Sequence, residues 1–181
     1  MDNKEFGNHL GQIVIDNLAN LKPIEGTGIK TSQVKFEYAY NHDDEDKLAE
    51  AQQVMEIWNN QGDKTAATEK AKQLGLNSVY HASSIVARVK RGASGKMELN
   101  ALRAGGLAFV TAPYEMFSEN GLYIKENSPY DTTFLVTGNS GYIPSAEAYD
   151  YGSYEAHTGY FAKGTAEKLA EEFVRLLGEV K

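Results

Sequence analysis

The fold is decided by residues 107–137, which read LAFVTAPYEMFSENGLYIKENSPYDTTFLVT. The apolar runs 107–112 and 132–137 have the length and composition of buried strands. The segment between them, 115–126, has the pattern of a helix, with Phe117 and Ile124 on one side. A helix of this length can serve as the crossover between two parallel strands. Both strands would then end at the same edge of one sheet.

The flanking sequence adds further strands and a covering helix. Alternating apolar residues at 97–101, followed by Gly105-Gly106, predict a hairpin with the strand at 107. Residues 29–40 alternate as a half-buried strand would. Residues 165–178 form an amphipathic helix pattern whose apolar positions are Leu169, Phe173, Leu176 and Leu177.

The rest of the chain is predicted to be mostly helical. Helices are expected at 5–21, 46–60 and 65–74. The pattern of 77–89 is ambiguous and favours a helix to about Ser84 followed by extended chain. Residues 138–162 are predicted to be a loop. We therefore expect a mixed α/β fold, in which helices flank a mixed β-sheet and residues 1–181 form one compact unit.

Composition excludes several classes of function. The 181 residues carry 18 basic and 25 acidic side chains, a net charge of −7, which disfavours a nucleic-acid footprint or docking on anionic lipid. The chain has no cysteine, so disulfides, thiol catalysis and Cys-based zinc sites are excluded. No apolar run approaches a membrane span, and the first residues lack a secretory signal pattern.

The four histidines do not predict a local metal site. His9, His42, His81 and His157 are scattered, and no two share the three- or four-residue spacing of a helical zinc pair. His9 and His42 are predicted to be solvated. His81 and His157 are flanked by small residues and are more simply read as hydrogen-bonded structural histidines than as ligands.

Tyrosines are concentrated in the C-terminal half, where eight of the 11 lie between Tyr114 and Tyr160. They are open to two readings, a binding surface of aromatic side chains or ordinary packing at the rim of the fold. Glu115 directly follows the strand 107–112. It is either a group at the catalytic edge of an open sheet or merely an acid in the first turn of a helix.

Several ordered motifs in this half resemble the neutral/alkaline non-lysosomal ceramidases, and especially their bacterial relatives of uncharacterised substrate. The resemblance is strongest over 97–178 and fainter over 5–40. It is carried by Ala-Pro-Tyr-Glu-Met-Phe-Ser-Glu at 112–119, Lys-Glu-Asn-Ser-Pro-Tyr at 125–130, Gly-Tyr-Ile-Pro-Ser-Ala-Glu-Ala-Tyr at 141–149 and Gly-Ser-Tyr-Glu at 152–155.

The resemblance implies the C-terminal portion of a larger catalytic domain, in which zinc activates water to hydrolyse a linear N-acyl amide such as the sphingolipid ceramide. Glu115 and Tyr142 would be zinc ligands in that domain. Tyr154 would be the catalytic hydroxyl that stabilises the oxyanion. Because much of the family is secreted, the resemblance implies that the full-length parent protein is secreted or periplasmic. The chain itself indicates no location.

One departure from the family pattern is large. The family's remaining zinc ligands are histidines from the N-terminal part of a longer chain, and no motif here matches them. A catalytic zinc normally has three protein ligands and a water. We therefore expect this chain to bind zinc weakly or not at all and to be inactive until an N-terminal segment completes the site. Two alternatives are a non-catalytic, Tyr-rich module that binds a lipid or sugar, and a truncated remnant without a function of its own.

Overall fold

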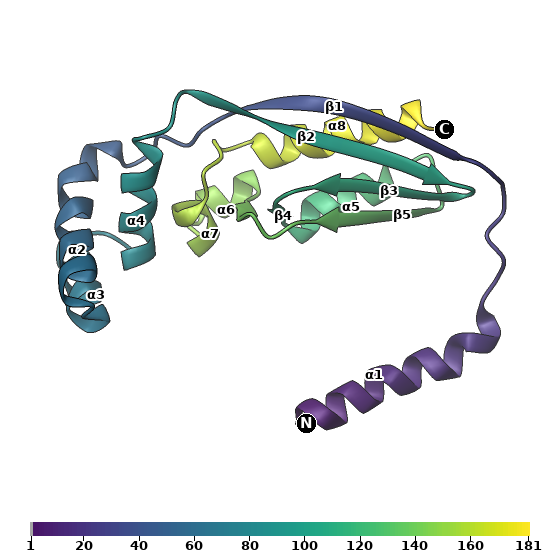
Figure 1. Cartoon of the computed structure of the whole chain (residues 1–181), viewed down its shortest axis with the longest axis horizontal. Coiled ribbons are helices and arrows are strands. Elements are labelled where there is room, and N and C mark those ends of the chain that lie inside the picture. The colour runs from purple at the N-terminus through teal and green to yellow at the C-terminus, as the bar shows by residue number, and fades with distance from the viewer. Residues whose placement is uncertain (1) are drawn as a thin grey trace.

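A four-stranded mixed sheet organises the computed structural model, which describes residues 2–181 (Figure 1). Its order is β1-β2-β3-β5, where β1 is Ile29–Ala39, β2 is Ser94–Ala104, β3 is Leu107–Ala112 and β5 is Thr132–Thr137. The first three strands are antiparallel neighbours, whereas β3 and β5 are parallel, with Leu107 opposite Thr132 and Ala112 opposite Thr137. The mixed α/β fold and the strand–crossover–strand unit at 107–137 are therefore confirmed.

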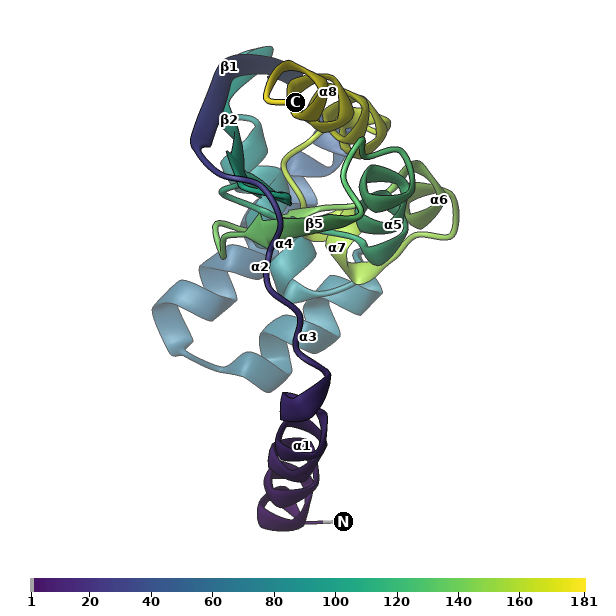
Figure 2. The ribbon, with the colours of Figure 1, turned by 90° about the vertical axis from the view of Figure 1, so that its right-hand side faces the viewer.

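Two helices cover one face of this sheet (Figure 2). They are α5 (Ser118–Glu126) and α8 (Thr165–Glu179). The apolar stripe predicted for 165–178 lies at the centre of the core, since all four of its residues are fully buried. They pack against Leu99 and Val110, which point to this face from β2 and β3.

The opposite face carries exposed apolar groups near the β5 edge. Phe109 of β3 stacks on Phe134 of β5 with ring centroids 5.0 Å apart, and Phe134 and Val136 remain about half exposed. Within the described residues, β5 pairs only with β3. Its other edge therefore has backbone groups free to pair with a further strand.

A helical lobe, residues 45–88, lies between β1 and β2 and is seen at one end of the sheet in Figure 1. It consists of the 3₁₀ turn η2 (Glu45–Lys47) and the helices α2 (Leu48–Gln61), α3 (Lys64–Gln73) and α4 (Val79–Arg88). The lobe has its own apolar cluster, which includes Val54, Leu76 and Ile85. The helices predicted at 46–60 and 65–74 are confirmed.

The prediction of extended chain after Ser84 is wrong, because α4 continues to Arg88. Val79, Ala82 and Ile85 recur every three residues and are buried in the lobe. Ser84 and Arg88, one helical turn apart, are buried on the side that faces the rest of the chain. Two buried faces of one helix resemble the alternation of a strand when only sequence is considered.

Two boundaries in the C-terminal half also differ from expectation. The helix predicted at 115–126 begins only at Ser118, and Glu115–Met116 form a short strand, β4, parallel to β6 (Tyr142–Ile143). The loop predicted at 138–162 contains β6, α6 (Ala146–Asp150) and α7 (Tyr154–Thr158). Ser145 and Ser153 start these helices by accepting the backbone N–H groups of Ala148 and Ala156.

The N-terminal helix α1 (Asn3–Asn17) and the turn η1 (Leu18–Asn20) stand away from the sheet in both views (Figures 1 and 2). The helix predicted at 5–21 thus forms, with Asp2 and Glu5 making a capping box. Its apolar stripe is exposed, since Phe6, Leu10 and Val14 are each about half accessible to solvent. None of the helices in residues 2–181 combines the length and apolar character that a membrane-spanning helix needs.

Candidate functional site

The ends of the parallel strands place two of the predicted site residues side by side. The N–H of Gly138 donates to the carbonyl of Ala112 (2.8 Å), and the N–H of Glu115 donates to the carbonyl of Gly141 (2.8 Å). These bonds join the loops that follow β3 and β5. As a result, Glu115 and Tyr142 are direct partners in the β4–β6 ladder. Partners in a parallel ladder send their side chains to the same face of the sheet.

Tyr154, the third predicted residue, contacts Tyr142 through its ring. The two centroids lie 6.5 Å apart in an edge-to-face arrangement. Tyr80 approaches Tyr154 from α4 with a centroid distance of 6.2 Å. Burial and the neighbouring phenol of Tyr142 raise the pKa of Tyr154, so its hydroxyl keeps its proton and can donate a hydrogen bond.

These three tyrosines and Tyr160 line an open cavity of about 350 Å³ that we call the tyrosine cavity. Asn139 and Ser140 form part of its wall, whereas Glu115 lies beside it on β4 and does not line it. Tyr80 was not singled out from the sequence. The chain carries no local signal for it, because the other tyrosines of the cavity are far from it along the chain.

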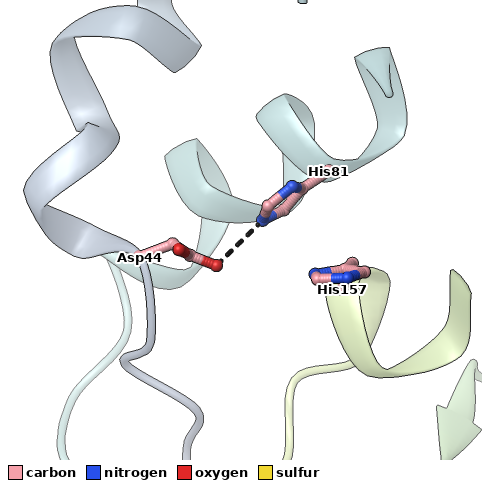
Figure 3. A group of neighbouring side chains, drawn as sticks. All are labelled: Asp44, His81 and His157. Atoms are coloured by element: carbon pink, nitrogen blue, oxygen red, sulfur yellow. Dashed lines mark hydrogen bonds and ion pairs between the residues drawn. The ribbon is translucent and has the colours of Figure 1, made fainter. Parts of the chain in front are cut away.

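A second group was missed by the sequence analysis and consists of Asp44, His81 and His157 (Figure 3). Each can offer one ligand atom such that all three atoms lie within 4.8 Å of one another. Oδ2 of Asp44 and Nε2 of His81 are 3.2 Å apart, and the two imidazole centroids are 4.7 Å apart. The residues come from the start of η2, from α4 and from α7, so no spacing rule along the chain could have joined them.

The local hydrogen bonds fix the proton on His81. Its Nδ1 accepts the backbone N–H of Asn77 (3.3 Å), so neutral His81 carries its proton on Nε2 and donates it to Asp44. Burial and the nearby His157 lower the pKa of His81 to about 4, against the opposite pull of Asp44. His81 is thus the hydrogen-bonded histidine that the sequence predicted.

Asp44 is held in an unusual backbone conformation. Its φ of 62° is the only positive value among the non-glycine residues described. Aspartate tolerates the left-handed region better than most residues, at a small cost in energy. Its other carboxylate oxygen pairs with Nζ of Lys47 at 2.7 Å. Although burial opposes ionisation, the bond from Lys47 keeps the pKa of Asp44 below its ordinary value.

A cavity of about 90 Å³ adjoins this group and is lined by Asn41, Asp43, Asp44, Arg88, Tyr149 and His157. Arg88 is almost fully buried and donates to the carbonyls of Gly159 (3.2 Å) and Asp43 (3.4 Å), while its Nε has no hydrogen-bond partner among the described residues. Burial lowers the pKa of Arg88 and raises that of Tyr149 to about 12.

The contact between α4 and α7 separates the tyrosine cavity from the group of Asp44, His81 and His157. Tyr80 and His81 are neighbours on α4, and Tyr154 and His157 lie one turn apart on α7. Tyr80 meets Tyr154 on the side of the tyrosine cavity, whereas His81 meets His157 on the side of Asp44. Among the described residues, Glu115 is not within the 4.8 Å group of the histidines. The chain therefore presents two candidate centres.

The low pKa of His81 predicts that stability is lost in mild acid. Between pH 6.5, the value for an unfolded histidine, and about 4, the unfolded chain binds a proton that the folded chain does not. The contribution of His81 to the free energy of unfolding is therefore fully present above pH 6.5. It is lost as the pH falls toward 4, and the loss is about 3 kcal/mol at most. Urea unfolding in the presence of a chelator, across this range, measures the effect.

A His81→Gln variant should have a shallower stability profile between pH 6.5 and 4, whereas His9→Gln, on the exposed α1, should keep the wild-type slope. The groups that face His81 are His157, Asp44 and Arg88, so the difference between the variant and wild type isolates the histidine from them. Identical slopes for His81→Gln and wild type would contradict the assignment.

Comparisons with known proteins add a partial likeness. No family model and no curated protein matches the chain. Two solved structures, a neutral ceramidase from Pseudomonas aeruginosa and a ceramidase complexed with C2, are similar over 45% of this chain at 18% sequence identity and a TM-score of 0.39. The chain matches only 14–15% of the length of those structures.

Proposed function

We propose that the chain is the C-terminal portion of a zinc-dependent, ceramidase-like hydrolase of linear N-acyl amides. Glu115 and Tyr142 supply two oxygen ligands to the metal, and Tyr154 acts on the substrate carbonyl. The observation that carries the proposal is the pairing of Glu115 with Tyr142 in the β4–β6 ladder, with the ring of Tyr154 at that of Tyr142.

The chemistry of these groups suits amide hydrolysis. Glu115 and Tyr142 would hold zinc, which would supply a bound water whose pKa is near 7 and which could attack the amide carbon. The hydroxyl of Tyr154, which its raised pKa keeps protonated, donates to the oxygen on which negative charge develops. Collapse of that oxyanion would break the C–N bond and release the carboxylic acid, and the amine nitrogen would take up the proton that the attacking water gave up.

Two ligands do not complete such a site, so we propose that histidines of an N-terminal segment provide the rest. The unpaired edge of β5 and the exposed Phe134 and Val136 support this proposal, because they offer a surface on which further chain can pair and pack. Without that segment, the chain is expected to be inactive. The substrate class is a small N-acyl amide or a lipid such as a sphingolipid, and the tyrosine cavity would hold part of it.

The test combines the chain with the histidine-bearing N-terminal segment of a bacterial neutral ceramidase and zinc, and measures fatty-acid release from a short-chain ceramide. We expect activity only in the mixture. Glu115→Gln should abolish it, and Tyr154→Phe should lower it by about 10²–10³-fold, as removal of an oxyanion donor does. Tyr151→Phe is the matched control, because Tyr151 is largely exposed and is not in the wall of the cavity.

Activity that survives Glu115→Gln, or no activity in any mixture that forms a complex, would count against the proposal. The second candidate, a binding module, is favoured by the contribution of Tyr80 to the cavity, since this residue lies outside the ceramidase-like motifs. Such a module would bind an alkyl glycoside or lipid without the added segment. That binding would be lost in Tyr80→Ala and unchanged in Glu115→Gln.

A further inference from the structure

Asp44, His81 and His157 have the composition of a divalent metal site. Two imidazole nitrogens and one carboxylate oxygen are ligands that zinc and similar ions accept, and three protein ligands leave a fourth position for water. The three residues come from separate elements, and the left-handed backbone of Asp44 directs its carboxylate toward His81. The adjoining 90 Å³ cavity, which Asp44 and His157 line, has room for the water.

The spacing of the ligand atoms is close to that of a tetrahedral site. Zinc binds nitrogen and oxygen at about 2.0–2.2 Å, which places neighbouring ligand atoms roughly 3.3 Å apart. Asp44 and His81 already meet this value at 3.2 Å, and the widest separation in the group is within 4.8 Å. Most of the remaining adjustment falls on His157, which is half-buried on the five-residue helix α7.

The charge around the group also suits a divalent cation. The segment 43–47 holds three aspartates, one glutamate and one lysine, and Arg88 binds the carbonyl of Asp43. Four acids and two bases give this neighbourhood a net charge of −2. Lys47 and Arg88 direct their donors to Asp44 Oδ1 and to backbone carbonyls, so Oδ2 of Asp44 is the oxygen that faces the histidines.

Loading the site requires one proton to move. Nε2 of His81 must lose its proton to bind a metal, and a proton on Nδ1 would then face the N–H of Asn77. Asn77 is exposed, so water can replace His81 as the hydrogen-bond acceptor of its N–H. This rearrangement weakens binding relative to a preformed zinc site and makes it fall in acid, because the metal competes with protons.

We propose that Asp44, His81 and His157 bind a divalent transition-metal ion such as zinc or cobalt, and that the ion links the helical lobe to the α7 region. This site is separate from Glu115 and Tyr142. It departs from the expectation of no tight zinc binding, which rested on the absence of any motif that matches the histidine ligands of the ceramidases. The bound ion does not need to take part in hydrolysis, because its ligands lie on the far side of the α4–α7 contact from the tyrosine cavity.

The test titrates the chelator-treated chain with cobalt and with zinc. We expect one ion per chain, the visible absorption of tetrahedral cobalt, and a zinc-dependent rise in the melting temperature. His157→Ala should weaken zinc binding by at least about 100-fold, more than the loss of a group that only hydrogen-bonds to a ligand would. His42→Ala is the matched control, because His42 is an exposed histidine directly before the same acidic segment. Its zinc affinity should equal that of wild type.

The outcomes separate this site from the proposed hydrolytic one. Binding that survives in Glu115→Gln and is lost in His157→Ala supports the new site. Binding that survives in His157→Ala, or no binding at millimolar zinc, overturns it. His157→Gln is a second variant that removes the imidazole. If the metal-free variants melt at the temperature of metal-free wild type, the loss of zinc binding comes from the lost ligand and not from misfolding. Hydrogen exchange in α4 should slow on zinc addition in wild type and in His42→Ala, and should not change in His157→Ala.

Discussion

Replacement of Gly138 by alanine is expected to lower the free energy of unfolding by about 1–3 kcal/mol and to displace Glu115 from Tyr142. The backbone of Gly138 lies against that of Pro113, so an added Cβ would overlap the Pro113 carbonyl oxygen and stand 2.8 Å from its carbon. Both neighbours are backbone atoms and cannot rotate away. The strain falls on the hydrogen bonds that join the loops after β3 and β5.

Urea unfolding of Gly138→Ala and of a control, Gly178→Ala, measures the effect. Gly178 lies in α8, where an added Cβ meets nothing within 4 Å, so alanine there should stabilise the chain by about 0.5–1 kcal/mol. When Gly138→Ala is mixed with the N-terminal ceramidase segment and zinc, the mixture should lack activity at temperatures where the variant is still folded. A Gly138→Ala chain as stable as wild type would contradict the prediction that the contact between an added Cβ and the backbone of Pro113 destabilises the fold.

Replacement of Arg88 by alanine is expected to destabilise the chain by about 3–5 kcal/mol. Arg88 is the largest fully buried side chain, and it connects the lobe to the rest of the fold through its bonds to the carbonyls of Asp43 and Gly159. Alanine would leave a cavity and two carbonyls without a donor, and it would leave the carboxylates of the acidic segment without their buried cation.

The matched control is Arg175→Ala, in which an exposed arginine loses its ion pairs with Glu172 and Glu179. Such surface pairs contribute at most about 1 kcal/mol. Arg88→Met, which restores most of the volume without the hydrogen bonds, should fall between the two. Equal urea midpoints for Arg88→Ala and Arg175→Ala would mean that the buried guanidinium contributes no more than a surface one.

Sequence patterns predicted the parts of this fold that depend on local periodicity. The parallel unit at 107–137 followed from two apolar strands with a helix between them, and α8 followed from four apolar residues on one face. The end of α4 could not be predicted, because Arg88 is buried by contacts with Gly159 and Asp43, which are distant in sequence.

The same distinction applies to the two candidate centres. Glu115 and Tyr142 were proposed from motifs, and the chain places them together because each follows a parallel strand. Asp44, His81 and His157 have no such signal. They are far apart along the chain, and only the packing of α4 against η2 and α7 brings them together.

The position of the helical lobe has a consequence for how the chain assembles. Ala39 pairs with Ser94, so β1 and β2 form a hairpin whose connection is the long segment 40–93. Closing so long a connection costs about 2 kcal/mol more entropy than closing a short turn, and contacts of high sequence separation slow folding. Because α2, α3 and α4 share their own apolar cluster, the lobe can form from local contacts first and shorten the search between β1 and β2. Pairing of β1 with β2 would then be a late event in folding. It would depend on prior formation of the helical lobe, although neither strand contributes a residue to the lobe's apolar cluster.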